Sequence, residues 1–395
     1  MNKSQIFSIF DNKIKLMSKP IPYDRNQPYN HLPLLPPPDE KVITVEILQA
    51  LNKANKALAE LKGLAKKLPN QSVLVNTIAL REAKASTEIE NIFTTDDELY
   101  RALSGSDISL KGNAKEVLYY RQALWQGYNF IDKEKKITTG LMVKLYQEIK
   151  RVNDGIRPTQ TETVIKQRGS GLLGGTTVYT PPRGEKIIEQ KLDNLIDYLN
   201  DDEKYNYDPL IKLAVSHYQF EAIHPFRDGN GRTGRIINIL LMIQKQLLDA
   251  PILYLSAYII NNKDEYYQYL DKITSQRNWN DWILYMLKAI EETSIYTINK
   301  INEIDRLFQK TLELVSSKLP QIRKEVVEKI FEQPYCSPQK LIDQNNVPRQ
   351  LGIKSINTAK KYLRQMEELK IMVPEKIGKE VVYLNIDLFN LLSDI

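Results

Sequence analysis

The sequence predicts a mainly α-helical protein of two or three domains. Apolar residues recur at helical spacing through most of the chain, and only one segment in its middle mixes β-formers with several glycines. Gly and Pro make up 16 and 19 of the 395 residues, too few for a fibrous repeat or wholesale disorder. A hydrophobic content of 42% is that of a globular protein, and a net charge of +6 is too small to make nucleic acid the default partner.

Cysteine usage and hydropathy predict a soluble, cytoplasmic protein without membrane contact. Cys336 is the one cysteine, so the chain cannot form a disulfide framework or a cysteine-based zinc site within itself. The N-terminus scatters charges among its apolar residues and offers no signal-peptide core. The longest apolar run, Ile239–Ile243, is far shorter than the roughly 20 residues that a membrane span requires.

An N-terminal helical domain is expected over residues 1–111. The proline-rich run 32–38 cannot be helical, because proline removes a backbone donor and fixes φ. Asp39 and Glu40 come next, where a helix start favours acidic side chains. Helical spacing then predicts helices from residue 44 to about 67, from 72 to 91 and from about 96 onward.

The middle domain, residues 112–306, also reads mainly as helices. Residues 163–182 differ, because they combine β-formers with four glycines and end in two prolines. This composition predicts a β-hairpin with a mobile tip. The run 169–174 spells GxGxxG, but residues 176–182 after it cannot open a helix, so a dinucleotide fingerprint is rejected.

The remaining residues, 307–395, change in pattern. Three helices are expected, at 325–332, 338–344 and 355–369, and two short β-like runs come after them at 371–373 and 381–384. Gly378 separates the two runs. Three helices with a small two-stranded wing resemble a winged helix-turn-helix.

The most informative stretch runs from His224 to Arg235. His224 titrates in the range of a general base, and Asp228 offers the hard oxygen ligand that Mg²⁺ prefers. Gly229-Asn230-Gly231 lets backbone N–H groups converge into an anion-binding nest at a helix N-terminus. Arg232 and Arg235 share a helix face and can close over a polyphosphate.

Each part of this motif has a structural explanation when taken alone. A histidine before proline is usually structural, Gly-Asn-Gly is a common turn, and Asp228 with the arginines would make a surface ion cluster. Phe226 is expected to point inward and anchor the loop. The order and spacing of all the parts favour a site that grips a nucleotide triphosphate.

Through residues His224 to Arg235, the chain resembles the Fic (filamentation induced by cyclic AMP) family. The family's signature, HxFx[DE]GNGRxxR, is matched at every fixed position. The resemblance implies a Fic-type helical core that moves AMP from ATP onto a Ser, Thr or Tyr hydroxyl of a protein, including its own, and releases pyrophosphate. It implies His224 as the base and Asp228 as the Mg²⁺ ligand. The implied phosphate cradle consists of Gly229, Asn230, Gly231, Arg232 and Arg235.

The resemblance extends to further parts of the middle domain. The related death-on-curing kinases carry a lysine at the position of Gly231. The glycine in this chain favours AMP transfer. The hairpin is expected to be the family's flap, whose edge would hold the target through Val178, Tyr179 and Thr180. In relatives a tyrosine lines the adenine side of the pocket, so Tyr266 or Tyr267 is a candidate, although aromatic residues on a helix are more often core.

A second motif lies in the N-terminal domain. Residues 86–91 match the family's inhibitory pattern [ST]xxxE[GN], with Ser86, Glu90 and Asn91 at its fixed positions. Ser86 and Glu90 lie four apart on one helix face. A glutamate on a helix is usually solvated, but here Glu90 is expected to pair with Arg235 and occupy the guanidinium that would otherwise take the γ-phosphate.

Other functions remain open at the level of sequence. One is a DNA-binding regulator, because the last long helix carries Lys354, Lys360, Lys361 and Arg364, although Glu367 and Glu368 offset them. The C-terminal segment would serve equally for protein docking or for a homodimer. A Fic enzyme that removes AMP, or that uses UTP, GTP or a choline-bearing diphosphate, is a further alternative. His31 and His217 have no metal-type partners at useful spacing, and His217 is expected to pack or to form hydrogen bonds.

Overall fold

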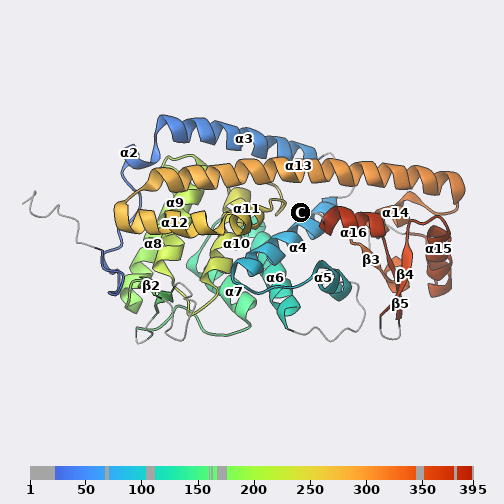
Figure 1. Ribbon diagram of the computed structural model, residues 1–395, viewed down its shortest axis with the longest axis horizontal. Coiled ribbons are helices and arrows are strands. Elements are labelled where there is room, and N and C mark those ends of the chain that lie inside the picture. Colours follow the sequence, from blue (N-terminus) through green and yellow to red (C-terminus); the bar gives the residue numbers. More distant parts are fainter. Residues whose placement is uncertain are drawn as a thin grey trace, which may run out of the picture.

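Helices dominate the protein, as predicted (Figure 1). The computed structural model describes residues 23–66, 71–103, 112–159, 161, 163–166, 176–343, 351–377 and 380–393. Within this described part, no helix is both long and apolar enough to cross a membrane.

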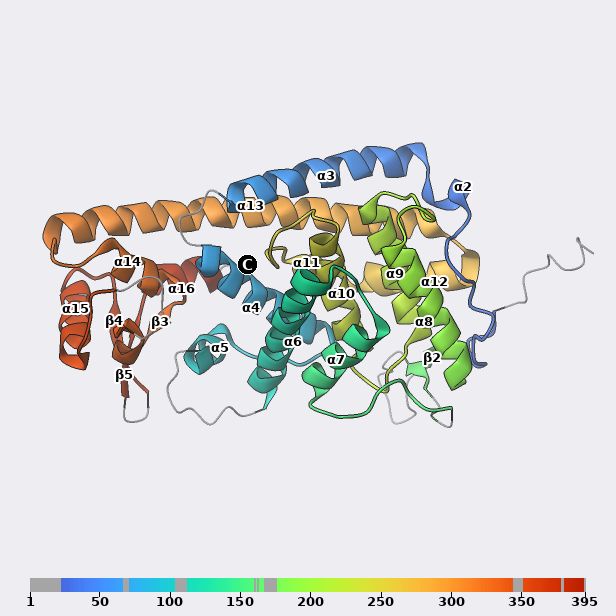
Figure 2. The same ribbon diagram turned by 180° about the vertical axis from the view of Figure 1, so that it is seen from behind.

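The N-terminal helices begin where the sequence predicts. They are α2 (Asp39–Val42), α3 (Val45–Ala65), α4 (Gln71–Ile89) and α5 (Asp96–Leu103). Thr44 caps α3, because its hydroxyl accepts a hydrogen bond from the backbone N–H of Ile47 at 3.2 Å. The apolar face of α3 packs along the longest helix of the protein, and both run along the same edge of the molecule (Figures 1 and 2).

The middle of the chain forms a helical core with one hairpin. Its elements are α6 (Asn113–Glu134), α7 (Thr139–Lys150), β1 (Ile165–Lys166), β2 (Thr177–Tyr179), α8 (Glu185–Asn200), α9 (Pro209–Ile223), α10 (Asn230–Gln244), α11 (Leu255–Asn261) and α12 (Lys263–Gln276). Helices α9 and α10 are buried on almost every face and pack on each other at the centre. Strands β1 and β2 pair antiparallel, with Ile165 opposite Tyr179, and the expected mobile tip lies outside the described residues.

A single 40-residue helix, α13 (Trp279–Lys318), joins the core to the C-terminal part. It passes through residue 307 without a break, so the two parts are connected by helix and not by a loop. Beyond it lie α14 (Lys324–Phe331), β3 (Tyr335–Cys336), the 3₁₀ helix η1 (Pro338–Leu341), α15 (Ile356–Glu368), β4 (Val373–Ile377), β5 (Glu380–Leu384) and α16 (Ile386–Ser393).

The C-terminal sheet differs from the expected two-stranded wing. It has three antiparallel strands in the order β3-β5-β4. The two residues of β3 are too few to show a period-2 pattern, so the sequence did not reveal this strand. The expected run at 371–373 overlaps the observed strand only at Val373, because β4 continues through Pro374 to Ile377. β4 lies at the sheet edge, where a proline without a donor is tolerated.

Candidate active site

The loop between α9 and α10 carries the motif from His224 to Arg235. His224 closes α9 in the left-handed region (φ 50°, ψ 59°), and its backbone N–H donates to the carbonyl of Phe220 at 3.0 Å. Gly229, at φ 73°, precedes the first turn of α10 in a conformation that favours glycine. The loop therefore places a helix C-terminus and a helix N-terminus on either side of five residues.

Asn230 and Phe226 hold this loop in shape. The Asn230 side chain accepts from the Phe226 N–H and donates to the Phe226 carbonyl, both at 2.9 Å. The Phe226 ring is 1% exposed and stacks on Tyr146 with ring centroids 4.4 Å apart. Phe226 thus points inward as predicted, and the Asn230 amide is occupied by the loop itself.

Arg157, which the sequence did not single out, fixes the backbone around His224. Its Nε donates to the His224 carbonyl at 2.7 Å, and Nη2 donates to the carbonyls of Ile223 and Pro182. Burial, with a contribution from Arg157, lowers the pKa of His224 to about 4. The imidazole is therefore neutral at pH 7, and its Nδ1 is buried without a hydrogen-bond partner of ordinary geometry among the described residues.

Asp228 lies at the surface of the same loop. Its side chain is 67% exposed, and Oδ2 pairs with Lys150 Nζ from α7 at 2.6 Å. Burial opposes ionisation, but Lys150 and the N–H of Gly229, which donates to Oδ1 at 2.6 Å, lower the pKa of this carboxyl. No group of three or more metal-ligating side chains occurs among the described residues, so a metal at Asp228 would need further ligands from a substrate.

The first turn of α10 offers unpaired donors. Thr233 donates the first helical hydrogen bond, to Gly229, which leaves the N–H groups of residues 230–232 without intrahelical acceptors. Arg232 Nη1 donates to Glu116 Oε2 on α6 at 2.6 Å. The Arg232 side chain is 2% exposed, and its Nε has no acceptor within the described part of the chain.

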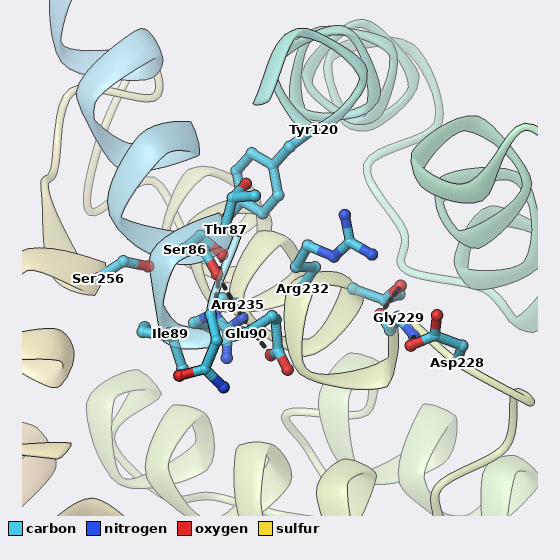
Figure 3. A network of polar contacts seen from close by, with 12 residues as sticks. Ser86, Thr87, Ile89, Glu90, Tyr120, Asp228, Gly229, Arg232, Arg235 and Ser256 are labelled. Carbon is cyan, nitrogen blue, oxygen red and sulfur yellow. Dashed lines mark hydrogen bonds and ion pairs between the residues drawn. The ribbon is translucent and has the colours of Figure 1, made fainter. Parts of the chain in front are cut away.

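Arg235 is held much more completely, by α4 (Figure 3). Its Nε donates to Ser86 Oγ at 2.8 Å, and its Nη2 donates to the Ser86 carbonyl at 2.8 Å and to Glu90 Oε1 at 2.7 Å. Burial opposes the charge, but the Glu90 carboxylate raises the pKa of Arg235 overall. The expected contact between Glu90 and Arg235 is present, while its inhibitory role stays a prediction.

Gly231 lies directly beneath this ion pair. A Cβ atom there would be 2.4 Å from Glu90 Oε1 and 2.9 Å from Arg235 Nη1. Both distances are shorter than real Cβ contacts, so a side chain at position 231 would require Glu90 and Arg235 to shift.

The α4 helix, which carries Ser86 and ends one residue before Glu90, is anchored by buried contacts. Glu82, one turn earlier and 1% exposed, accepts hydrogen bonds from the Ser256 N–H at 2.8 Å and the Tyr120 hydroxyl at 3.2 Å. At the far end Asn91 adopts φ 62°, and its side-chain oxygen accepts from Lys263 Nζ at 3.2 Å. The α4 segment is therefore fixed on both sides of Glu90.

The two candidate tyrosines have different surroundings. Tyr266 is 2% exposed, and its hydroxyl pairs with His217 Nε2 at 2.8 Å among the rings of Trp282 and Tyr285. Tyr267 is 45% exposed, while burial of its hydroxyl and the nearby Glu90 charge raise the hydroxyl's pKa. His217 thus forms the hydrogen bond expected of it, and Tyr267 is the more exposed of the two candidates, whose nucleotide role stays a prediction.

The hairpin residues contact the N-terminal segment. The Val178 carbonyl accepts from the Tyr23 hydroxyl at 3.1 Å, and the Thr180 carbonyl accepts from the Tyr29 N–H at 3.0 Å. The Tyr179 hydroxyl donates to the Ala222 carbonyl at 2.8 Å, which ties β2 to the end of α9. The role of these three residues in holding a target stays a prediction.

Family models match most of the chain in three blocks. The Fic/DOC family N-terminal model matches residues 48–129, the Fic/DOC family model 136–242, and the C-terminal domain model of SoFic-like protein adenylyltransferase 307–388.

Relatives at the level of sequence are named protein adenylyltransferases. The chain is 32% identical over 165 residues to protein adenylyltransferase fic-1 of Caenorhabditis elegans, which covers 41% of this chain and 30% of that protein. It is 28% identical over 118 residues to protein adenylyltransferase Fic of Nematostella vectensis, which covers 29% and 25%. The chain thus spans less than a third of the length of these two curated relatives.

The fold has a solved counterpart. The crystal structure of a Fic family protein from Desulfovibrio desulfuricans G20 is similar with a TM-score of 0.54 and 20% identity, covering 87% of this chain and 96% of that chain. At this identity the similarity shows a shared fold.

Proposed function

Because the chain belongs to the Fic/DOC family, we propose that it transfers AMP from ATP to a Ser, Thr or Tyr hydroxyl of a protein, including its own. One observation carries the proposal. The buried Arg232 guanidinium, with an Nε that lacks an acceptor among the described residues, lies at the N-terminus of α10 on the same loop as a neutral histidine. Unpaired donors at a helix N-terminus are the groups that bind a polyphosphate.

The proposed chemistry assigns a role to each of these groups. The neutral His224 ring accepts the proton of the target hydroxyl, whose oxygen then bonds to the α-phosphorus of ATP. The bond from that phosphorus to the bridging oxygen breaks, and pyrophosphate leaves with the electron pair. The N–H groups of the first turn of α10 and the Arg232 guanidinium stabilise the negative charge that develops.

The loop residues also fit a magnesium ion. Asp228 presents an exposed, ionised carboxylate, and Mg²⁺ is commonly bound by one or two carboxylates plus substrate phosphates. Lys150 forms an ion pair with this carboxylate, and that ion pair would have to break when the magnesium ion binds. When bound, the ion would neutralise phosphate charge.

The same proposal assigns Glu90 a braking role. Glu90 and Ser86 occupy the Nε and Nη2 donors of Arg235, so a γ-phosphate would have to displace a charge-assisted contact to reach them. A nucleotide that cannot use Arg235 lies in an orientation unsuited to transfer. Tyr267 is the proposed adenine-side residue, and Val178, Tyr179 and Thr180 are the proposed target-holding residues of the flap.

Mass spectrometry of the Glu90→Gly protein after incubation with Mg²⁺ and each nucleotide tests this function. We expect a mass increase of one AMP from ATP, and no increase when His224 is also replaced by alanine. A gain of UMP or GMP would reassign the donor, and loss of AMP from a pre-modified protein would indicate removal. Unmodified protein with every nucleotide would contradict a transferase.

A docking role for the C-terminal part is a second candidate. Lys354, Lys360, Lys361 and Arg364 are exposed on and before α15 and form no ion pair within the described residues. Duplex DNA binding by the full chain that weakens steeply with salt, and that Lys361→Glu abolishes, would support a nucleic-acid partner. Binding that does not depend on salt would favour a protein partner. We also propose a reducing cytoplasm as the compartment, which suits the one cysteine, Cys336.

A further inference from the structure

Glu116 holds a position at the site that no motif describes. It lies in the first turn of α6, and its Oε2 accepts a hydrogen bond from Arg232 Nη1 at 2.6 Å. The Glu116 side chain is 32% exposed, whereas the Arg232 side chain is 2% exposed. The carboxylate thus reaches from the rim of the site to a guanidinium that is enclosed by protein.

The contact uses only part of the guanidinium. One Nη1 donor is engaged, while Nε is buried and has no acceptor within the described residues. An arginine has five donors in a fixed plane, so a single bond from Nη1 restricts the guanidinium and leaves its other donors available. A buried donor without a partner costs free energy, which a ligand oxygen would recover.

Glu116 supplies a counter-charge to Arg232 from the first turn of α6, near the positive end of the helix dipole. The paired charges also reduce the cost of burying Arg232, because a buried charge without a counter-ion is strongly unfavourable. Glu116 therefore contacts Arg232 through Nη1 alone and leaves its Nε without an acceptor among the described residues, whereas Ser86 and Glu90 occupy both Nε and Nη2 of Arg235.

We propose that Glu116 is a positioning residue, which orients Arg232 so that its remaining N–H groups donate to the β- and γ-phosphate oxygens of the nucleotide. The inference rests on the proposed function for naming ATP as the ligand. It predicts that loss of the carboxylate weakens binding of polyphosphates, in contrast to loss of Glu90, which releases activity.

Titrations of the full-length Glu90→Gly protein with ATP, AMP and inorganic pyrophosphate test this role, with Glu116→Gln as the variant. The amide cannot hold the guanidinium by charge, so we expect affinity for ATP and pyrophosphate to fall about tenfold and affinity for AMP to change less than about twofold. In transfer assays the KM for ATP rises by a similar factor, while kcat changes less than about threefold. Glu116→Asp keeps the charge and restores most of the affinity.

Glu134→Gln is the matched control, because Glu134 lies exposed at the other end of the same helix. It should leave all three affinities and the melting temperature unchanged. Unchanged ATP affinity in Glu116→Gln, equal losses for ATP and AMP, or increased transfer would overturn the positioning role. If no protein transfers AMP but pyrophosphate binding still depends on Glu116, the proposed function fails while this inference stands.

Discussion

Arg232 and Arg235 lie three residues apart on α10, yet the protein treats them differently. Arg235 donates three hydrogen bonds, from Nε and Nη2, to Ser86 of α4 and to Glu90 in the turn after it. Arg232 donates one bond to Glu116 of α6 and keeps a buried Nε without an acceptor among the described residues. We propose that the difference separates a carboxylate that blocks a phosphate-binding arginine from one that orients it, according to which donors it occupies.

The difference between Arg232 and Arg235 concerns nucleotide binding, so removing the proposed general base, His224, should leave nucleotide binding unchanged. In the Glu90→Gly background, His224→Ala should lower the transfer rate about 10²- to 10⁴-fold, because the proton of the hydroxyl has no acceptor. ATP affinity should stay within about twofold, since both arginines remain. Single-turnover kinetics with labelled ATP and equilibrium titration measure the two quantities.

His31→Ala provides the control, because His31 is an exposed histidine outside the loop. An equal loss of ATP affinity in His224→Ala would mean that the histidine organises the phosphate site as well as the chemistry.

Removing the blocking carboxylate should have the next largest effect. Glu90→Gly removes the carboxylate from Nη2 of Arg235, which keeps its bond to the Ser86 carbonyl, and we expect auto-modification to rise at least about tenfold, the equivalent of one charge-assisted hydrogen bond of about 1.4 kcal/mol or more. Incorporation of α-labelled ATP measures the rise.

Glu88→Gly introduces the same glycine into α4, but Glu88 pairs with Lys84 at 3.8 Å and not with Arg235. A comparable rise in this control would show that loosening the helix, rather than freeing Arg235, activates the enzyme.

A smaller change sharpens the comparison further. Ser86→Ala removes the Oγ that accepts from Arg235 Nε but keeps the Ser86 carbonyl and Glu90. We expect a two- to fivefold rise, about 0.5–1 kcal/mol, in the same labelling assay. Thr87→Val serves as control, because the Thr87 hydroxyl donates only to the Ala83 carbonyl of its own helix. An unchanged labelling rate in Ser86→Ala would mean that Glu90 alone accounts for the inhibition.

The smallest expected effect is that of pH. The lowered pKa of His224, about 4, keeps the base neutral down to pH 5, so kcat/KM of Glu90→Gly should change less than about twofold between pH 8 and 5.5. An unshifted histidine would lose about tenfold over this range. A depressed folded-state pKa also makes the fold less stable as pH falls from 6.5 toward 4, because the unfolded chain binds the proton first. Urea unfolding at each pH separates the two effects.

The sequence predicts the loop well, because its functional residues are consecutive and their spacing fixes their geometry. The Glu90–Arg235 contact is predicted only through the family's second motif. Glu116 and Arg157 show no such signal, since their partners lie 116 and 67 residues away and only the packing of α6 and of the hairpin against the core brings them together. The long helices are predicted by apolar periodicity, whereas β3 is too short to have one.

The bare Cα of Gly231 has an evolutionary consequence. The space that a side chain would fill there is taken by the Glu90 carboxylate, 2.4 Å from where a Cβ would lie. A side chain at position 231 would therefore require the Glu90 carboxylate and the Arg235 guanidinium to move, while it also altered the proposed phosphate cradle. We expect variation at this one position to change the proposed nucleotide site and the Glu90–Arg235 contact together.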